Sequence, residues 1–294
     1  MEREPLSNIF LPLDFSEASD LMVKYVSSLA KKYRSRVTLF HAIEEWMVIH
    51  VAGGYDVTGL IRDLEARSRD MLEKAKAELE RNGVNADIYS DVPVADPGIA
   101  IVDAAKDSYA SEIFVASKGH GLHRIIPLGS TVSIVVKLSS VPVVRFKVVK
   151  GEDGKPKIHG PPDPFKRVMV CVDRNATRDM MRYSIALALK SGGRLYFLHV
   201  IEGGREPEGK VKALLKTASS MAEEAGVDNE VIVVTGSPYK SILQLAIQLD
   251  ITSILMGRTV SRSFNEYIMG STLDRVLAFS SQPVIVYPLG EVER

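Results

Sequence analysis

The sequence predicts two tandem α/β domains, each an open, five-stranded, mostly parallel sheet with helices on both faces. Short apolar runs alternate with segments of helical periodicity, and no hairpin turn joins one run to the next, which is typical of parallel strands linked by crossover helices. The same order of elements occurs twice. A chain of 294 residues is also long enough for two domains of ordinary size, each with its own core.

The first half begins with a strand at 9–13, because this short apolar run ends at Asp14 and helix-start residues follow it. β-Branched and aromatic residues predict a second strand at 37–43. The remaining strands of this half are predicted at 87–92, 113–116 and 141–146, and its helices at 15–29, 64–79, 99–110 and after Gly129. Pro142 favours a strand start or a sheet edge for the last of these strands.

A linker is predicted between the two halves. Residues 151–164 contain three glycines, four prolines and several charges but almost no apolar residue, which is the composition of a semi-rigid linker. The sequence therefore predicts a first domain at 1–150, a linker at 151–165 and a second domain at 166–294.

The second half repeats the first with a nearly fixed offset. Asp173 follows Asp14 by 159 residues, and His199 follows His41 by 158. Later pairs lie 141 residues apart, namely Pro97 with Pro238, Gly129 with Gly270 and Pro142 with Pro283. One insertion in the first half, between Trp46 and Leu60, accounts for the difference. This segment is either a flap or partner contact, or an irregular lead-in to the next helix.

Composition excludes several classes of function. Lysine plus arginine and aspartate plus glutamate each number 37, so no net field recruits nucleic acid or an anionic membrane. No apolar run reaches membrane-spanning length and the first residues lack an apolar signal core, so we expect a cytoplasmic protein. The single cysteine, Cys171, lies in an apolar run and is expected to be a buried, unreactive thiol.

Candidate ligand-binding residues follow the strands, because open α/β sheets bind ligands at the carboxyl ends of their strands. Asp14 directly follows the first predicted strand. A ligand contact and a cap for the next helix are equally consistent with this position. His41 lies near the end of the second predicted strand, where a hydrogen-bonded core histidine is the favoured interpretation over a ligand contact.

A Gly-Ser-Thr sequence opens a helix in both halves, at 129–131 and at 270–272, each time after a strand and a basic loop. The first N–H groups of a helix have no partner within it, and the helix dipole is positive there, so such a start suits a phosphate group. The alternative for each copy is an ordinary serine N-cap after a glycine turn. The Gly-Ser-Thr sequence recurs at the same place in both halves, and this recurrence favours a phosphate site.

These residues resemble the universal stress protein family, over nearly the whole chain apart from the linker and the segment from Trp46 to Leu60. Residues 11–17, Leu-Pro-Leu-Asp-Phe-Ser-Glu, are similar to the first strand of the family, and His199-Val200-Ile201 is similar to its second. The resemblance implies a Rossmann-like fold of the adenine nucleotide alpha hydrolase type. It also implies AMP or ATP as ligand, with Mg²⁺ as a possible companion of ATP.

The nucleotide loop of ATP-binding members reads G-x2-G-x9-G-[ST], and neither copy here is intact. In the first copy Ala116 stands at the leading glycine, which adds one methyl group where the ribose approaches. In the second, Val260 stands at the middle glycine and resists the positive φ of a loop that wraps phosphate. Arg258 and Arg262 either offset this loss by their charge or are solvated loop arginines.

By this resemblance, Asp14 and Asp173 meet the adenine, together with the backbones of Ile43 and Ile201. The resemblance assigns no catalytic residue and no metal ligand. The nucleotide-binding residues it implies are Pro12, Asp14, Ile43, Ala116, Ser117, Gly119, Gly129, Ser130 and Thr131 in the first domain, and Asp173, Ile201, Gly257, Arg258, Val260, Gly270, Ser271 and Thr272 in the second. Because Gly257 leaves room for the ribose, the second domain is expected to be the better site, for a monophosphate.

The leading hypothesis is an adenine-nucleotide-binding module that regulates or senses stress. Two alternatives stay open, a slow nucleotide hydrolase and an interaction scaffold that binds no nucleotide. The apolar strands that contain Val143, Val144 and Val286 predict that the two domains pair with each other through their fifth strands. A homodimer is possible as well, whereas nucleic acid and membrane partners are not expected.

Overall fold

The computed structural model of the protein describes residues 4–45, 48, 57–118, 128–203, 209–258 and 271–290. In the first half the elements are β1 (Asn8–Pro12), α1 (Glu17–Tyr33), β2 (Arg36–Phe40), β3 (Ile43–Glu44), α3 (Val57–Arg81), β4 (Ala86–Ile88), β5 (Val94–Ala95), α4 (Pro97–Asp107), β6 (Glu112–Lys118), α5 (Ser130–Leu138) and β7 (Val143–Lys150). They are followed by β8 (Pro156–His159), β9 (Arg167–Cys171), α6 (Arg178–Ser191), β10 (Arg194–Ile201), α7 (Gly209–Glu224), β11 (Asn229–Thr235), α8 (Pro238–Gln248), β12 (Ser253–Arg258), α9 (Ser271–Phe279) and β13 (Val284–Pro288).

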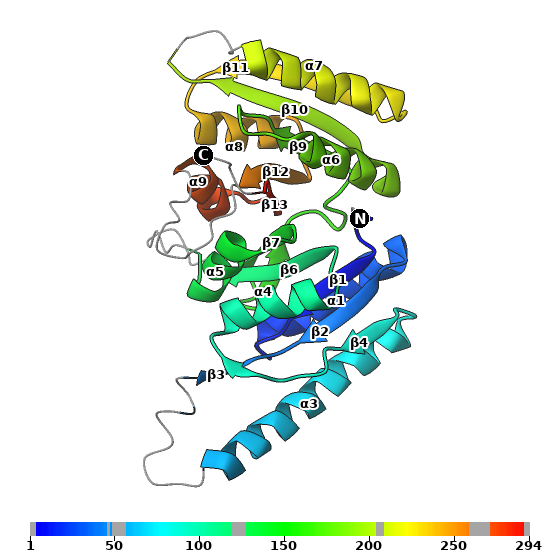
Figure 1. The fold of residues 1–294 in the computed structure, drawn as a ribbon, viewed down its shortest axis with the longest axis vertical. Coiled ribbons are helices and arrows are strands. Elements are labelled where there is room, and N and C mark those ends of the chain that lie inside the picture. The colour runs from blue at the N-terminus through cyan, green and yellow to red at the C-terminus, as the bar shows by residue number, and fades with distance from the viewer. Residues whose placement is uncertain are drawn as a thin grey trace.

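One continuous sheet of eleven strands runs through the described part of the chain (Figure 1). The first half contributes five strands in the order β4-β2-β1-β6-β7, and the second contributes β11-β10-β9-β12-β13. Within each half all neighbouring strands of these two series are parallel. The predicted fold class, two tandem α/β domains with five-stranded parallel sheets, is therefore confirmed.

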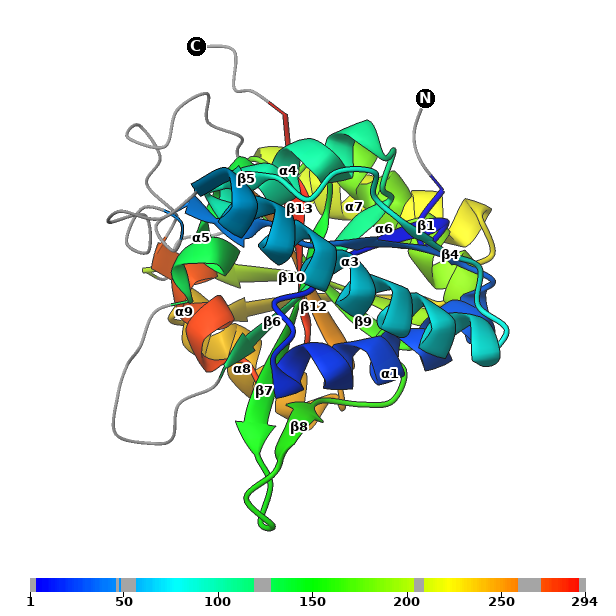
Figure 2. The ribbon, with the colours of Figure 1, turned by 90° about the horizontal axis from the view of Figure 1, so that it is seen from below.

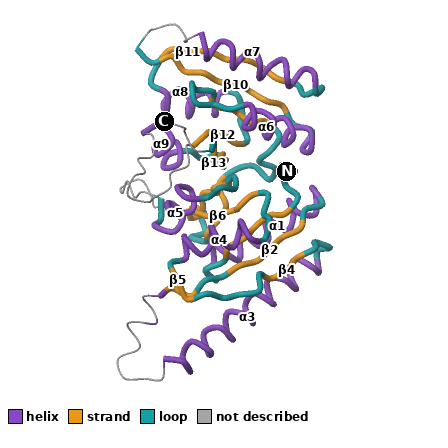
Figure 3. The backbone as a smooth tube through the Cα atoms, viewed as in Figure 1, coloured by secondary structure: helices purple, strands orange, loops and turns teal. Residues whose placement is uncertain are grey.

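Helices cover both faces of the sheet (Figures 1, 2 and 3). Buried residues of α1, α3, α6 and α7 pack in one apolar cluster with side chains such as Leu11, Phe146 and Phe197. Buried residues of α4, α5, α8 and α9 pack in a second cluster with Phe10, Val143 and other side chains of alternate strand positions. Because side chains alternate across a strand, these two clusters lie on opposite faces.

The two halves meet where β7 pairs antiparallel with β13. Val284 lies opposite Arg145, Ile285 opposite Val144 and Val286 opposite Val143. Each strand thereby covers an apolar edge that would otherwise be exposed, as the sequence predicts, and the pairing of the two domains through their fifth strands is confirmed. We call this junction of β7 and β13 the seam.

Two strands of the first half end earlier than predicted. The second strand ends at Phe40, not at 43, and Ile43 belongs to the separate strand β3, which pairs with β5. The third strand spans only Ala86–Ile88 of the predicted 87–92 region. β3 and β5 form a two-stranded sheet of their own, because the Ile43 N–H donates to the carbonyl of Pro93 at 2.8 Å and not to a main-sheet strand.

The predicted linker contains a strand. β8 pairs antiparallel with β7, Lys147 lying opposite His159 and Lys150 opposite Pro156, so that the two strands form a hairpin that projects from the molecule (Figure 2). Gly154 has a φ of +77°, which suits glycine at the turn. Periodicity could not reveal this strand, since its burial alternates weakly and its sequence is rich in turn residues.

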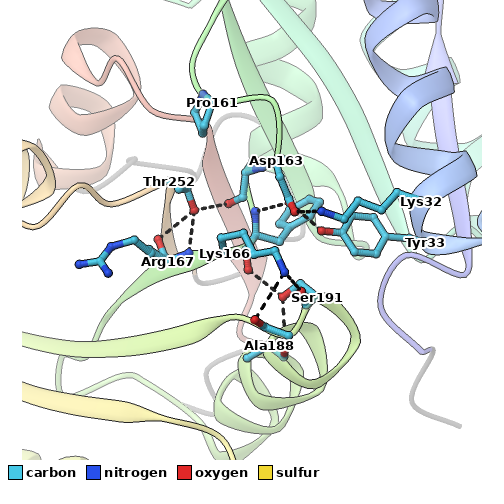
Figure 4. A network of polar contacts seen from close by, with 12 residues as sticks. Lys32, Tyr33, Pro161, Asp163, Lys166, Arg167, Ala188, Ser191 and Thr252 are labelled. Atoms are coloured by element: carbon cyan, nitrogen blue, oxygen red, sulfur yellow. Dashed lines mark hydrogen bonds and ion pairs between the residues drawn. The ribbon is translucent and has the colours of Figure 1, made fainter.

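Side chains of both domains hold the end of the linker (Figure 4). Asp163 accepts a hydrogen bond from the Tyr33 hydroxyl at 2.6 Å and forms an ion pair with Lys32, both on α1. On the other side, the Thr252 hydroxyl donates to the carbonyl of Pro164 at 3.0 Å. The Tyr25 hydroxyl donates to the Pro161 carbonyl at 2.8 Å. The linker is thus attached to α1 of the first domain and to the segment before β12 of the second.

Residues 46–47 and 49–56, which include most of the inserted segment, lie outside the described residues, and α3 begins at Val57. None of the helices in the described ranges is long and apolar enough to cross a membrane.

Candidate functional site

The order of strands changes direction between β1 and β6 in the first half and between β9 and β12 in the second. β1 leads to β2 through α1, whereas β6 leads to β7 through α5, and these two helices belong to opposite faces of the sheet. Open α/β sheets bind ligands beside the carboxyl ends of strands at such a change of direction. We call this part of each domain its switch-point edge.

Asp14 lies at the switch-point edge of the first domain, directly after β1. One carboxylate oxygen, Oδ1, accepts from the Ser16 N–H at 3.0 Å and from the Ser19 hydroxyl at 2.5 Å. The residue is exposed, and the N-cap of α1 is Ser16. Asp14 therefore shapes the turn into α1 without being its cap.

Asp173 has the equivalent position and the equivalent turn in the second domain. Its Oδ1 accepts from the Asn175 N–H at 2.9 Å, and the residue is exposed. Thr177 is the N-cap of α6. The duplicated aspartates thus present their carboxylates in the same way at the two switch-point edges.

The two duplicated histidines stabilise these turns. Nδ1 of His41 lies 2.7 Å from the carbonyl oxygen of Leu13, and Nδ1 of His199 lies 2.8 Å from that of Val172. Burial lowers the pKa of His41, although its hydrogen bond to Leu13 opposes this. The interpretation of His41 as a hydrogen-bonded core residue is confirmed. The ring of Phe15, whose φ of +56° lies in the left-handed region, packs 4.3 Å from the His41 ring.

The two isoleucine backbones that are predicted to meet adenine already have partners in the protein. The Ile43 N–H donates to Pro93, as described above, and the Ile201 carbonyl accepts from the Gly236 N–H at 3.0 Å. Pro12 lies at the end of β1, opposite Phe40 of β2. Of these three residues, Pro12 and Ile201 belong to the main sheet and Ile43 does not.

The start of α5 presents donors at the switch-point edge. Gly129 is the N-cap and forms no side-chain cap, while Ser130 is the first residue of the helix. The alternative of a serine N-cap is therefore wrong for the first copy. Gly129 and Ser130 are exposed, Thr131 is half-buried, and a Cβ placed on Gly129 would meet nothing within 4 Å. Among the described residues, no cap side chain accepts from the first N–H groups of α5, so these donors suit a ligand.

The residues at the end of β6 contact the neighbouring strand β7. Ala116 pairs with Phe146 of β7, and its side chain packs against the core cluster of the α1 face. The Ser117 hydroxyl donates to the Phe146 carbonyl at 3.4 Å. Gly119 lies outside the described residues.

Gly257 does not have open space beside it, contrary to the prediction of room for a ribose. A Cβ placed on Gly257 would lie 2.7 Å from Cδ1 of Leu289. The small residue therefore lets the Leu289 side chain lie against β12. The space beside this glycine in the second domain holds a leucine that packs against the core.

Arg258 neither points at a phosphate site nor lies in solvent, so both interpretations of this residue are corrected. It is 3% exposed, and its guanidinium reaches across the seam to the end of α5. There Nη1 donates to the Lys137 carbonyl at 2.5 Å and Nη2 to the Ser139 carbonyl. A cation at the end of a helix satisfies its last carbonyls and complements its dipole.

The second phosphate-loop copy is only partly described. Ser271 and Thr272 begin α9, whereas Val260, Arg262 and Gly270 lie outside the described residues. The described residues contain no group of three or more His, Cys, Asp or Glu side chains that could hold a metal ion. Cys171 is half-buried, less than predicted, and burial raises the pKa of its thiol to about 12, which is typical of an unreactive cysteine.

A sequence model described as the universal stress protein family matches residues 5–147 and again residues 164–288. The chain belongs to the universal stress protein family. Each match covers one of the two five-stranded parallel halves of the sheet, so this universal stress protein contains the family's fold twice.

Similar proteins support the tandem arrangement. A universal stress protein of Mycolicibacterium smegmatis is 25% identical over 95% of this chain and 96% of its own length. The crystal structure of a universal stress protein from Archaeoglobus fulgidus has a TM-score of 0.77 and 26% identity, and the alignment covers 96% of this chain and 98% of that one. A universal stress protein of Methanocaldococcus jannaschii is 28% identical over 47% of this chain and 93% of its own length.

Sequence reasoning did not predict the burial of three charged residues of this universal stress protein, Glu112, Arg145 and Arg258. Glu112 and Arg145 are 0% and 1% exposed. A charged residue inside an apolar strand was the available signal, since Arg145 interrupts the run Val143-Val144-Arg145-Phe146. Comparison with the second half adds to that signal, because Val286 stands at the duplicated position.

Proposed function

We propose that this universal stress protein binds an adenine nucleotide at its switch-point edges and acts as a regulatory or sensing module in a stress response. The observation that carries the proposal is the start of α5. The exposed Gly129 and Ser130, without a side-chain cap, begin a nine-residue helix at the edge where a change of strand order favours ligand binding.

Asp14 and Asp173 support adenine as the base. Each carboxylate is exposed directly after the first strand of its domain, where it can accept a hydrogen bond from an exocyclic amine. Guanine presents a carbonyl oxygen at the corresponding position of its ring, so we expect GTP to compete poorly.

The first domain is the better candidate on the described geometry. Leu289 occupies the space beside Gly257, and Arg258 is bound to α5, so two supports for the second domain are lost. The proposal includes AMP or ATP as the ligand, Mg²⁺ as a companion of ATP, and a homodimer. The domain boundaries at 1–150, 151–165 and 166–294 likewise stay a prediction.

The nucleotide-contacting residues that we keep in the proposal are those of the family pattern, with Arg258 removed. They are Pro12, Asp14, Ile43, Ala116, Ser117, Gly119, Gly129, Ser130 and Thr131 in the first domain and Asp173, Ile201, Gly257, Val260, Gly270, Ser271 and Thr272 in the second.

Calorimetry with AMP, ATP and GTP tests the proposal on wild-type protein and on Gly129→Val. The substitution places a branched side chain over the α5 donors, yet a Cβ there has open space and the backbone φ of −51° is ordinary. Gly209→Val is the matched control, because this glycine also begins a helix with open space around it. We expect Gly129→Val to remove the AMP site of the first domain and the control to keep it. Equal AMP stoichiometry and affinity in all three proteins would exclude that site.

A further inference from the structure

Arg145 is a buried cation, and two of its three guanidinium nitrogens have no hydrogen-bond partner in the part of the chain that the structure describes. It lies in β7 between β6 and β13, opposite Val115 on one side and Val284 on the other. Only 1% of the residue is exposed, and neither Nε nor Nη1 has a hydrogen-bond partner among the described residues. A buried guanidinium in this state is costly, since Nε and Nη1 have lost their water and gained no acceptor among the described residues.

Lys147 adds a second positive charge on the same face of β7, because side chains two residues apart on a strand point the same way. Burial and the charge of Arg145 lower the pKa of Lys147, so the two cations lie near each other. Burial alone lowers the pKa of Arg145, to about 10. No carboxylate of the described chain contributes to either pKa shift.

The fold does not require these cations. The duplicated positions in β13, 141 residues later, hold Val286 and Pro288. Val286 is buried opposite Val143 on the same seam. An apolar residue therefore fills this place in the second domain, and the arginine and lysine belong to the first domain alone.

The cation pair lies beside the switch-point edge of the first domain. Lys147 lies opposite Ser117, near the carboxyl end of β6. The next element along the chain after β6 is α5. Val143 packs in one cluster with buried residues of α5 and α9. Because side chains two residues apart on a strand share a face, Arg145 and Lys147 lie on the sheet face that these helices cover. Two adjacent cations match the charge of a phosphate dianion, and arginine donates to its oxygens in a fixed fork.

We propose that Arg145 and Lys147 form a binding site for a phosphate group in the first domain. The phosphate is either free in solution or the phosphoryl group of the proposed nucleotide. The site uses side chains of β7, so it is separate from the backbone donors at the start of α5, and it does not depend on adenine recognition.

Thermal unfolding tests the site with inorganic phosphate as the probe, against sodium chloride at matched ionic strength. Arg145→Met and Lys147→Met remove one cation each, and Lys150→Met is the control because Lys150 is exposed at the end of the same strand. We expect phosphate to raise the Tm of wild type and of the control but not of Arg145→Met. In phosphate-free buffer, Arg145→Met should melt above wild type, since it removes a buried unpaired charge.

The proposal is overturned if Arg145→Met melts below wild type without phosphate and still responds to phosphate like wild type. Lys147 is only partly buried, so its variant is expected to fold, and an unchanged phosphate response in Lys147→Met contradicts the proposal independently.

Calorimetry with AMP and adenosine separates the two sources of phosphate. A tenfold or larger loss of AMP affinity in Arg145→Met, with adenosine unaffected, identifies the phosphoryl group of the nucleotide as the occupant. Loss of the phosphate response with unchanged AMP affinity identifies free phosphate. Wild-type protein that responds to phosphate through Arg145 but binds no AMP would refute the proposed function and leave this inference standing.

Discussion

The hydroxyl of Tyr183, on α6 of the second domain, donates a hydrogen bond of 2.9 Å to the carboxylate of Glu112, on β6 of the first. The Leu6 N–H donates to both carboxylate oxygens, at 3.1 and 3.0 Å, and the Ser111 hydroxyl donates to one of them at 2.7 Å. Glu112 is fully buried. The two domains are therefore joined by a buried polar contact in addition to the seam.

The first prediction concerns pH. Burial raises the pKa of Glu112 from 4.5 to about 7, although the hydrogen bonds from Ser111, Tyr183 and Leu6 oppose the shift. Between pH 4.5 and about 7, Glu112 keeps its proton in the folded protein but has lost it in the unfolded chain. Its contribution to the free energy of unfolding therefore falls as pH rises through this range, by about 3 kcal/mol at most. Urea unfolding of wild type and Glu112→Gln from about pH 4.5 to 8 measures the difference.

Glu73→Gln is the matched control for that experiment, because Glu73 is exposed on α3. Its pH profile should follow wild type, while Glu112→Gln should lack the fall between about pH 4.5 and 7. Parallel profiles for all three proteins would mean that Glu112 titrates alike in the folded and unfolded states.

A second prediction concerns Tyr183→Phe. The substitution removes one donor from a buried carboxylate and keeps the ring that packs 5.2 Å from Tyr287. We expect a loss of stability of about 1.5–3 kcal/mol above pH 7, where Glu112 is ionised, and a smaller loss at about pH 5. Urea unfolding at both pH values provides the measurement. An equal loss at both would show that the contact does not depend on the charge of Glu112.

A third prediction follows from the position of Arg258. Arg258→Met keeps the apolar stem but leaves the carbonyls of Lys137 and Ser139 without their charged donor, which should lower stability by about 2–3 kcal/mol. Denaturant unfolding gives this value, and AMP titration of the same variant should give wild-type affinity. Lost AMP binding in a folded variant would restore Arg258 to the nucleotide site.

A fourth prediction concerns the attachment of the linker at Asp163 (Figure 4). Burial would raise the pKa of this carboxyl, but the hydrogen bonds from Lys32, Tyr33 and the Phe165 N–H lower it below its ordinary value of 3.8. The resulting stability is present above about pH 4 and is lost as pH falls below it.

Asp163→Asn keeps an oxygen that can accept from Tyr33 and Phe165 but loses the charge that pairs with Lys32. Because Lys32 is half exposed, we expect a loss of only about 1 kcal/mol at pH 7. The variant should also lose less stability than wild type on acidification below about pH 4. An acid limb identical to that of wild type in urea unfolding would contradict this account.

The sequence by itself determined the architecture of this protein. Apolar runs that alternate with helical periodicity are local signals, and the constant spacing of Pro97 with Pro238 and Gly129 with Gly270 shows the duplication without any structure. The pairing of the two fifth strands also followed, because apolar strand edges require a cover. The turns at Asp14 and Asp173 were placed correctly for the same local reason.

Only the tertiary structure decided which side chains meet. Arg258 binds carbonyls 119 and 121 residues away, and Glu112 receives the Tyr183 hydroxyl from 71 residues away and the Leu6 N–H from 106. Leu289 fills the space beside Gly257, which the loop pattern left for a ribose. A local sequence pattern specifies on which face of a strand or helix a residue lies. Its contact partner belongs to a distant segment that only folding brings opposite it. Burial then sets the free-energy cost of a charged group that has no partner.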